Sequence, residues 1–513
     1  MAMSATRAAV SPPPFTHREI LEVLSGALIG LLLAALDQTV VVTALPAIAD
    51  ELNGLQHLSW IVTAYLLTST ASTPIYGKLS DLYGRRRLIV IGIGIFVAAS
   101  AFCALAQSMG QLIAARALQG IGGGGLISMA QAIIADVIAP RERGRYQVYM
   151  SGIWALASVG GPVLGGVFVE YLSWRWVFWI NLPIGALGLV LCWRALKRLP
   201  VRGGYPRIDY LGAAILIPGV VALLLVASWG GVEFPWTSAP ILGLAAAGIL
   251  LLVAFALQEM RAPEPLLPPR LLLDPVILMA NLIGFVVSAG MFGAVVLLPV
   301  FLQLVLGRGA GDTGLLLIPL MGGTVLGAYP TGQWMRITGR YKKAPLLTLS
   351  GAVIAFVVLV FAGSTTPPWL VAIFIGLLGI GIGGAMPATL VAAQNAAEAR
   401  DIGAATASVA FFRSLGGSFG AAFLWSVLLA ALDSRLAQAG AGGMAGELLR
   451  SGAAATAIDP ALRAALPGAL LHGFRLAFAF GAAIMAASLA LTLLWKEIPL
   501  RGNVARTEPA AEL

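Results

Sequence analysis

The stretch LEVLSGALIGLLLAALDQTVVVTALP, residues 21–46, guides the interpretation of the whole chain. A helix of about 20 apolar residues crosses the hydrocarbon core of a bilayer, and this stretch is longer than that. Asp37 lies about 16 residues into it, roughly 24 Å along a helix. A carboxylate at such a depth costs about 2.5–3.5 kcal/mol and usually faces a polar cavity. We therefore predict a transmembrane helix here, with Asp37 as its functional residue.

The composition indicates a membrane protein with many spans. Of 513 residues, 59% are hydrophobic and only 11% are charged, whereas soluble domains carry about 25% charged residues. The two cysteines, Cys103 and Cys192, each lie inside an apolar segment, so we expect free buried thiols and no disulfide. Residues 1–21 are polar and lack the features of a signal peptide, and we expect cytoplasmic tails over 1–21 and 497–513.

Fourteen apolar segments predict an all-α integral membrane protein with fourteen transmembrane helices. The connections are short, except that residues 432–469, rich in Ala and Gly, predict an extracytoplasmic loop. The predicted spans are 22–45, 59–79, 87–106, 111–136, 146–170, 174–196, 209–230, 237–258, 276–304, 313–335, 344–363, 369–394, 403–431 and 470–496.

Basic residues predict the orientation of these helices. Of the 32 Lys and Arg residues, 24 lie in the two tails and in the alternate loops on the same side, and four lie in the remaining loops. An excess of Lys and Arg marks the cytoplasmic side of a membrane protein. We therefore place both termini in the cytoplasm. We interpret the net charge of +9 as an orientation signal rather than a surface for nucleic acid.

An internal repeat divides the chain into two related halves. GKLSDLYGRR from Gly77 returns as GQWMRITGRY from Gly332, and GIGGGG from Gly120 returns as GIGIGG from Gly379. The offsets are 255 and 259 residues, and the glycine pair at 161 and 165 returns at 416 and 420. Parallel repeats are typical of transporters whose substrate site lies near the midplane between the halves. We predict six-helix bundles over 22–196 and 276–496, with two inserted transmembrane helices in 197–275.

Several motifs resemble those of the fourteen-helix drug:proton antiporters of the major facilitator superfamily, and the likeness covers nearly the whole chain. The most specific is the loop pattern GKLSDLYGRR, and LDQTVVVTALP from Leu36 and WRWVFWINLP from Trp174 resemble marks of the fourteen-helix branch. Leu112, Arg116, Gln119 and Gly120 are similar to the helix-four motif, and Gly161, Pro162, Gly165 and Gly166 look like the helix-five motif of antiporters. Two positions depart from the patterns. Arg336 stands where the first loop has Asp81, and Ala157 stands where the antiporter motif usually has glycine.

The resemblance implies a transporter that works by alternating access, with protons as coupling ion and no other cofactor. It also implies a conformational latch in which Asp81 meets the positive end of a neighbouring helix. Arg85 or Arg143 would take acidic partners there. Charge that only sets the orientation is the alternative for Arg86 and Arg87. The predicted latch residues are Gly77, Asp81, Gly84, Arg85 and Arg143, and Arg336 predicts that the second half closes differently.

Asp37 and Arg116 are the predicted proton-coupling pair. An isolated carboxylate in a medium of low dielectric is driven toward its neutral form, and it offers a negative charge to a cation once the proton leaves. By helix rise, Arg116 and Asp37 lie roughly 8 and 13 Å from the outer face, which a long arginine can bridge. A fixed structural ion pair is the alternative. His17, His57 and His472 lie near membrane edges, so we expect no histidine relay.

Other polar residues inside the spans predict either a substrate cavity or bonds between helices. Position 292, equivalent to Asp37 in the repeat, is Phe292, so we expect the C-terminal half to supply mainly apolar lining. Gly120–Gly125 matches GxGxxG without a preceding strand, which favours close helix packing over a nucleotide site. No spacing indicates metal ligands, a catalytic triad or an ATP site, and we expect no enzyme. The candidate cavity residues are Gln119, Asn181, Asn281, Gln303 and Arg413.

These observations predict a proton-coupled exporter of small amphipathic compounds, cationic or lipophilic, in the inner membrane of a bacterium. A lipid or glycolipid exporter and a metabolite transporter of the same fold are the alternatives. A receptor or scaffold would need large soluble domains, and the sequence offers none. We expect a monomer surrounded by membrane lipids, and an accessory envelope protein is compatible with the sequence.

Overall fold

The computed structural model describes residues 17–52, 57–196, 209–231, 233–438, 445 and 460–502. Within these ranges the chain is built from helices, and pairing of extended backbone is limited to one bridge between Gly230 and Phe234. Most of the expected tails, residues 1–16 and 503–513, lies outside the described residues. So does most of the segment between 438 and 460.

The N-terminal half follows the predicted order of spans, with one break. Its helices are α1 (His17–Glu51), α2 (Leu58–Tyr83), α3 (Arg85–Leu105), α4 (Met109–Val137), α5 (Pro140–Tyr171), α6 (Trp176–Trp179) and α7 (Asn181–Ala195). The single predicted span 174–196 is therefore two helices that meet at Ile180. Pro183 has no N–H for the carbonyl of Trp179 four residues earlier, which explains why α6 ends there.

The remainder of the chain contains the two inserted helices and the C-terminal half. The inserted pair is α8 (Tyr210–Trp229) and α9 (Ala239–Glu259), followed by the short α10 (Pro269–Leu272). The C-terminal half comprises α11 (Pro275–Leu304), α12 (Ala310–Thr338), α13 (Lys343–Phe361), α14 (Pro368–Ala396), η3 (Ala399–Asp401), α15 (Ile402–Gln438) and α17 (Pro460–Leu494). Residues 432–469, expected to be a loop, are helical over 432–438 and 460–469.

Among the described residues, thirteen helical stretches are long and apolar enough to cross a bilayer, with α6 and α7 together forming one of them. The fourteenth expected span is α2, whose middle carries the polar run TSTAST at 68–73 and whose end carries Lys78 and Asp81. Its 26 residues extend over about 39 Å. It packs against α4 and α15, so its polar side chains face protein rather than lipid.

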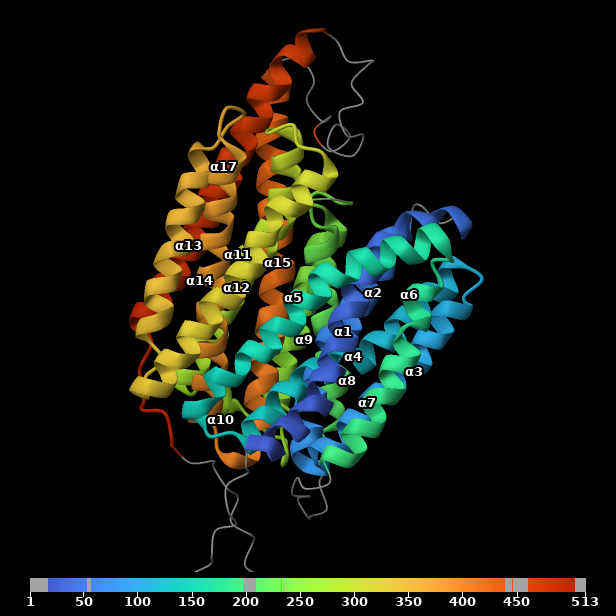
Figure 1. The fold of residues 1–513 in the computed structure, drawn as a ribbon, viewed down its shortest axis with the longest axis vertical. Helices are drawn as coiled ribbons and strands as arrows, with labels where there is room; N and C mark the ends of the chain where they lie inside the picture. Colours follow the sequence, from blue (N-terminus) through green and yellow to red (C-terminus); the bar gives the residue numbers. More distant parts are fainter. Residues whose placement is uncertain are drawn as a thin grey trace, which may run out of the picture.

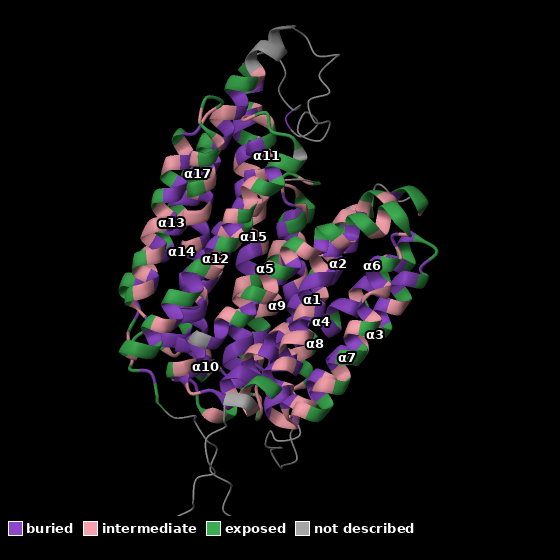
Figure 2. Ribbon diagram, viewed as in Figure 1, coloured by how far each residue is buried: buried purple, intermediate pink, exposed green. Residues whose placement is uncertain are grey.

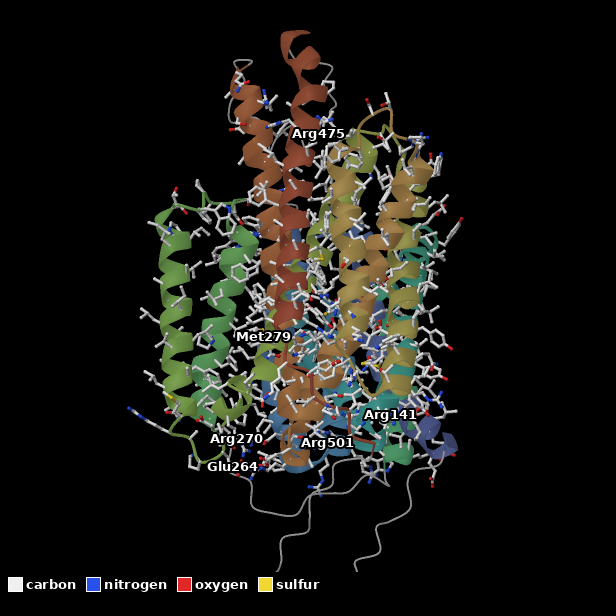
Figure 3. The ribbon with its side chains drawn as sticks, turned by 90° about the vertical axis from the view of Figure 1, so that its left-hand side faces the viewer. Arg141, Glu264, Arg270, Met279, Arg475 and Arg501 are labelled. Atoms are coloured by element: carbon white, nitrogen blue, oxygen red, sulfur yellow. The ribbon has the colours of Figure 1, made fainter. Side chains whose placement is uncertain are left out.

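The two halves touch at one end of the molecule and diverge toward the other (Figure 1). Both described chain ends lie at the end where the halves touch. Figure 3 places Arg141, Glu264, Arg270 and Arg501 at this end and Arg475 near the other. We call it the basic end, because it carries the loops with most of the Lys and Arg residues. The positive-inside pattern predicts that this end faces the cytoplasm.

Equivalent glycines bring equivalent helices together in the two halves, as the internal repeat predicts. Gly120 packs on α2 beside Tyr65, and Gly379 packs on α12 beside Leu320. Gly84 and Gly339, which follow α2 and α12, have φ angles of 90° and 66°. L-residues with a Cβ rarely adopt this region, so both turns favour glycine.

Glycine contacts also join the halves at the basic end. Gly77 of α2 packs on Gly403 of α15, and Gly332 of α12 packs on Gly144 of α5. The glycines at 77 and 332 are repeat equivalents, so α2–α15 and α5–α12 are matching contacts on opposite sides of the molecule. A Cβ at Gly144 would lie 2.6 Å from the Cα of Gly332.

The inserted helices cover one seam between the halves. Figure 3 shows α8 and α9, drawn in green, on one flank of the molecule. Leu216, Val220 and Leu224 of α8 form an apolar cluster with Leu67 of α2 and Leu415 of α15. The sequence offered no role for these helices, and the structure places α8 over the α2–α15 contact.

The loop after α9 continues this attachment to the basic end. The Nζ of Lys78 on α2 lies 2.9 Å from Glu264 in that loop. Glu259 accepts hydrogen bonds from the N–H groups of Leu266 and Leu267 and so fixes the start of the turn. The inserted hairpin is therefore held at the basic end as well as along the membrane.

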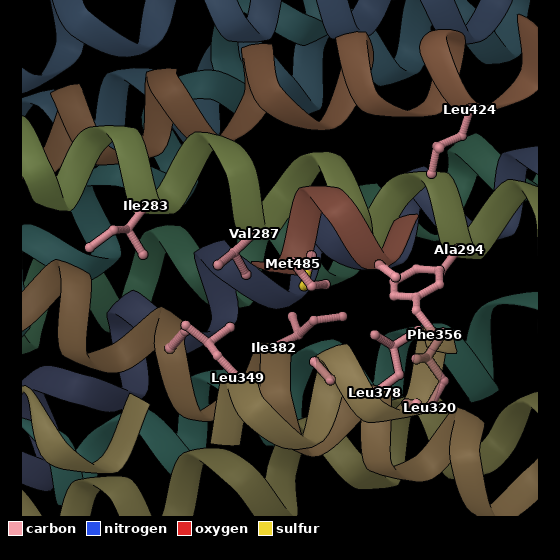
Figure 4. Packing of buried hydrophobic residues seen from close by; sticks show 14 of the residues in the cluster. Ile283, Val287, Ala294, Leu320, Leu349, Phe356, Leu378, Ile382, Leu424 and Met485 are labelled. Atoms are coloured by element: carbon pink, nitrogen blue, oxygen red, sulfur yellow. The ribbon is translucent and has the colours of Figure 1, made fainter. Parts of the chain in front are cut away.

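Buried residues form the interior of each half, and exposed residues lie on the outer helix surfaces (Figure 2). Figure 4 shows part of the C-terminal core, where Ile283 and Val287 of α11 face Ile382 and Met485. Large apolar side chains are also exposed, such as Leu347 at 78% and Phe361 at 75%. In a membrane protein such side chains face lipid.

The glycine contact between α5 and α12 gives a test of how the basic end closes. In Gly144→Val, the new side chain cannot fit against Gly332, so we expect the two helices to move apart at this end. Spin labels on the exposed residues Tyr149 and Ile337 would report a longer distance by pulsed electron paramagnetic resonance. Gly152→Val on the same helix is the control, because a Cβ there meets nothing within 4 Å. An unchanged distance in Gly144→Val would refute the contact.

Candidate functional site

Asp37 lies inside the N-terminal half, far from both ends of α1. Its side chain is fully buried, and its Oδ2 lies 2.5 Å from the Nη1 of Arg116 on α4. The carboxylate is therefore not isolated, contrary to one expectation, and it lies among helices of one half rather than between the halves. The pairing of Arg116 with Asp37 agrees with the depths that helix rise predicted for the two residues.

Two amides complete the shell around the Asp37 carboxylate. Gln119 donates from Nε2 over 2.8 Å, and Asn181 donates from Nδ2 over 3.0 Å, both to Oδ1. Ser100 of α3 accepts from both amides and donates to the carbonyl of Phe178. Every group bonded to the carboxylate is an N–H donor, which suits the ionised form. The break between α6 and α7 places Asn181 at the start of α7, where it can turn toward α1.

Arg116 has partners other than Asp37. Its Nε donates to the carbonyl of Ile61 over 3.1 Å, and its Nη1 donates to the Oε1 of Gln119 over 2.7 Å. The guanidinium carbon also lies 4.4 Å from the ring centroid of Tyr65. A cation over an aromatic face gains about 0.5–2 kcal/mol. These contacts would keep the guanidinium partly compensated if the carboxylate became neutral.

The five candidate cavity residues fall in three places. Gln119 and Asn181 belong to the Asp37 shell. Asn281 and Arg413 lie at the contact between α11 and α15 in the C-terminal half, where Ser408 donates to Asn281 and Gly284 packs beside Arg413. Gln303 is exposed near the end of α11. Sequence alone could not assign these residues to different groups, because the assignment depends on which face of each helix turns inward.

The predicted latch residue Asp81 joins the halves at the basic end. Its two carboxylate oxygens accept hydrogen bonds from the backbone N–H groups of Gly403 and Ala404, at 3.0 and 2.9 Å. These groups belong to the first turn of α15, where the helix dipole favours an anion. Arg85 lies 2.5 Å from Asp81 and 2.9 Å from Asp136. The carboxylate is thus held by its own half and bonded to the other.

Arg143 takes no acidic partner among the described residues, contrary to one of the two options in the sequence-based prediction. It is fully buried and donates to the carbonyls of Ile138 and Ala135, at 2.9 and 2.6 Å. Its Nη1 donates to Gln394 of α14 over 3.3 Å. Arg143 therefore caps the end of α4 and reaches the other half through an amide.

The second half closes with the opposite arrangement of charge. Arg336 near the end of α12 pairs with Glu142 in the first turn of α5 at 3.1 Å. Arg141 donates to the carbonyls of Arg336 and Ile337 in the last turn of α12. A basic residue at the end of α12 thus meets an acidic residue at the start of α5. The sequence predicted the asymmetry from Arg336 but not the partners.

A segment after α17, residues 495–501, ties the basic end together and was not predicted. Tyr341 donates to the carbonyl of Lys496 over 2.7 Å, and burial raises the pKa of Tyr341 to about 12, so the hydroxyl keeps its proton. Asn395 bonds to the carbonyl of Pro499 and to the N–H of Arg501. The carbonyl of Arg501 accepts from the N–H of Arg141 in the other half. Through its backbone N–H and carbonyl groups, this segment is hydrogen-bonded to both halves.

The helix-five glycines lie against α1 close to Asp37. Gly161 packs beside Thr39, and Gly165 packs beside Thr43. Thr39 also donates to the carbonyl of Ala157, the position that departs from the antiporter pattern. A small residue at 157 keeps that carbonyl accessible from α1.

Fold and site together define a membrane transporter rather than an enzyme, and the comparisons agree. The sequence profile of the Major Facilitator Superfamily matches residues 27–421. The chain belongs to this superfamily. It is 39% identical over 407 residues to the multidrug transporter protein MdtP of Bacillus subtilis, covering 79% of this chain and 74% of that protein.

Other relatives cover more of the sequence. Multidrug resistance protein 3 of Bacillus subtilis is 34% identical over 463 residues and is matched over 88% of both chains. An uncharacterized MFS-type transporter of Mycobacterium tuberculosis is 37% identical over 472 residues, which are 92% of this chain and 69% of that protein.

Solved structures show the same fold. The human organic anion transporter MFSD10 aligns with a TM-score of 0.60 at 17% identity, over 92% of this chain and 99% of that one. A bacterial homologue of the iron transporter ferroportin in an outward-facing state aligns with a TM-score of 0.59 at 12% identity, over the same shares.

Asp81 gives a test of the closed basic end. In Asp81→Asn, one acceptor oxygen becomes an NH₂ group that faces backbone N–H donors, so we expect closure to weaken by about 1–2 kcal/mol. Thr406 is fully buried, so a cysteine placed there reports opening of the basic end. We expect its labelling by a thiol reagent added at that end to be several-fold faster in Asp81→Asn than in the otherwise unchanged protein. Asp312→Asn, at the start of α12 and exposed, is the control. Equal labelling in the two variants would show that the carboxylate does not hold the halves together.

Proposed function

We propose that this chain is a proton-coupled exporter of amphipathic compounds in the inner membrane of a bacterium. The observation that carries the proposal is the buried pair of Asp37 and Arg116, an acid and a base at membrane depth within one half. Charged groups at such depth are costly and mark proton or substrate pathways. The basic end with its Lys and Arg residues would face the cytoplasm, and both termini with it.

Proton exchange at Asp37 supplies the coupling step. A proton that reaches the carboxylate from the outer side neutralises it and removes its attraction for Arg116. The guanidinium then keeps the carbonyl of Ile61, the Oε1 of Gln119 and the face of Tyr65 as partners. These alternatives lower the cost of breaking the pair, which otherwise leaves a buried charge uncompensated at about 3–5 kcal/mol.

Alternating access requires the basic end to open. The contacts that separate are Asp81 with the start of α15, Arg336 with Glu142, and Arg143 with Gln394. With the halves closed at this end, substrate leaves and protons enter at the other end. Release of the proton toward the cytoplasm resets the cycle, and a membrane potential contributes about 2.3 kcal/mol per charge per 100 mV.

Relatives named as multidrug transporters support the export of drugs. The amphipathic, cationic or lipophilic character of the substrate is part of the proposal. Because α8 covers the α2–α15 seam, a lipophilic compound entering from the bilayer would pass the α5–α12 side. An exporter of lipids, glycolipids or metabolites on the same fold is the second candidate. Entry from the bilayer on the α5–α12 side would favour lipid-soluble compounds over water-soluble metabolites.

The decisive variant is Asp37→Asn. Asparagine fits the site but cannot exchange a proton, so we expect gradient-driven extrusion of ethidium from proteoliposomes to fall at least tenfold. Asp50→Asn, at the exposed end of the same helix, is the control and should transport normally. Uphill extrusion that survives in Asp37→Asn would exclude Asp37 as the coupling residue.

Arg116→Lys separates charge from geometry. Lysine keeps the positive charge, but one ammonium group cannot hold Asp37, Ile61 and Gln119 in the planar arrangement of a guanidinium. We expect normal amounts of folded protein in the membrane and a loss of proton-driven extrusion of about tenfold. Arg175→Lys, at the outer pair with Glu51, is the matched control. Full transport by Arg116→Lys would mean that only the charge matters.

A further inference from the structure

Buried hydrogen-bond donors without a partner in the described part of the protein occur at several places in the C-terminal half, and three of them lie on α11 and α15 around Gly284. They are the Nδ2 of Asn281, the Oγ of Ser288 and the Nε of Arg413. Asn281 and Ser288 are buried side chains on α11, seven residues apart, and therefore on one face of the helix. Gly284 lies between them on that face and packs against the side chain of Arg413 from α15. Unsatisfied polar groups are rare in folded proteins because each costs about 1–3 kcal/mol.

Arg413 differs from the other buried arginines of the chain. Arg116 and Arg85 pair with carboxylates, and each nitrogen of Arg143 has a partner. Arg413 donates from Nη2 to the carbonyl of Met386 and, over 2.8 Å, to the hydroxyl of Thr389 on α14. Among the described residues it forms no ion pair. It is a membrane-embedded positive charge with only neutral partners.

The three donors lie at membrane depth above the closed basic end. Arg413 is 11 residues from the start of α15, or about 16 Å along the helix, whereas Asp81 meets α15 at its first turn. Arg413 and Met386 are partly exposed, while Asn281, Ser288 and Thr389 are buried. The cluster is thus partly exposed on the side of Arg413 and Met386 and buried in the core on the side of Asn281 and Ser288.

We propose that Asn281, Ser288 and Arg413 bind the anionic group of an amphipathic ligand. A carboxylate, sulfonate or phosphate has enough acceptor oxygens for the three free donors, and its charge would compensate the guanidinium. The apolar surroundings suit the rest of such a ligand. The inference rests on the proposed export function and extends its substrate class to amphipathic compounds that carry an acidic group.

A purely structural role for Arg413 makes a different prediction. The bonds to Met386 and Thr389 tie α15 to α14 and use Nη2 alone. If this were the whole role, removal of the guanidinium would lower the stability of the protein and weaken every ligand alike. Discrimination between an acidic ligand and its neutral ester separates the two roles.

Equilibrium binding of two matched dyes tests the site without a proton gradient. Rhodamine B carries a carboxylate, and its ethyl ester is the same molecule with that group blocked. We expect purified protein in phosphatidylcholine nanodiscs to bind rhodamine B, measured by fluorescence anisotropy. Arg413→Gln should weaken this binding about tenfold and Ser288→Ala a few-fold, with little effect on the ester. Arg413→Lys should retain part of the affinity.

The control is Arg308→Gln, an exposed arginine beyond α11, which should bind both dyes as the wild type does. Equal weakening of both dyes by Arg413→Gln, no weakening, or failure of the wild type to bind rhodamine B would overturn the site. Added phosphatidylglycerol that displaces rhodamine B only when Arg413 is present would identify a lipid phosphate as a source of the anion. Loss of transport in Asp37→Asn is a separate result, because this assay requires no coupling.

Discussion

The ion pair between Asp37 and Arg116 is the constraint on which the N-terminal half depends. A carboxylate and a guanidinium removed from water each cost several kcal/mol, and the pair repays this only with good geometry and further hydrogen bonds. Gln119 and Asn181 donate to the carboxylate, and the carbonyl of Ile61 accepts from Arg116. Ser100 holds the two amides by accepting from both, so four different helices contribute. Gly120 brings α4 against α2, and the break at Ile180 places Asn181 at the start of α7.

The two halves share a framework but differ in chemistry. Glycines at equivalent positions set the helix pairs α2–α4 and α12–α14, α1–α5 and α11–α15. In the N-terminal half, opposite charges satisfy each other inside the framework. Phe292, the counterpart of Asp37 by the repeat offset, is 47% exposed, so the sequence-based equivalence was wrong about the site. Gly161 meets Thr39 whereas Gly416 meets Phe285, which shifts the register of α11 relative to α1. In the C-terminal half the guanidinium of Arg413 stays without a counter-charge among the described residues. Duplication therefore explains the shape of both halves, and substitution at a few inward positions explains their different charges.

Hydropathy and the basic loops predicted nearly all helices, because lipid imposes length and apolarity on each span. They predicted α2 as well, although the run TSTAST lowers its hydropathy; hydroxyls of that run bond to carbonyls of its own helix and of α4. The prediction was wrong at the expected outer loop. Residues 432–438 and 460–469 are helical although they are less apolar. Asp37, Arg116 and Asp81 could be selected from sequence because charges in spans are rare, whereas Ser100 and Gln394 look like many other polar residues.

The closed basic end and the Asp37 site share two helices. The helix α2 contributes Ile61 to the site and Asp81 to the contact with α15, and α4 contributes Arg116 and Asp136. Arg336 and Glu142 are both about two-fifths exposed, so their pair adds at most about 1 kcal/mol to closure. The remainder of the closure then comes from Asp81, the bonds of Arg141 and Arg143, and the glycine contacts. In the proposed cycle, a change in how α2 and α4 pack around a neutral Asp37 acts on the same helices that carry Asp81 and Asp136, so it acts directly on the contacts that close the basic end.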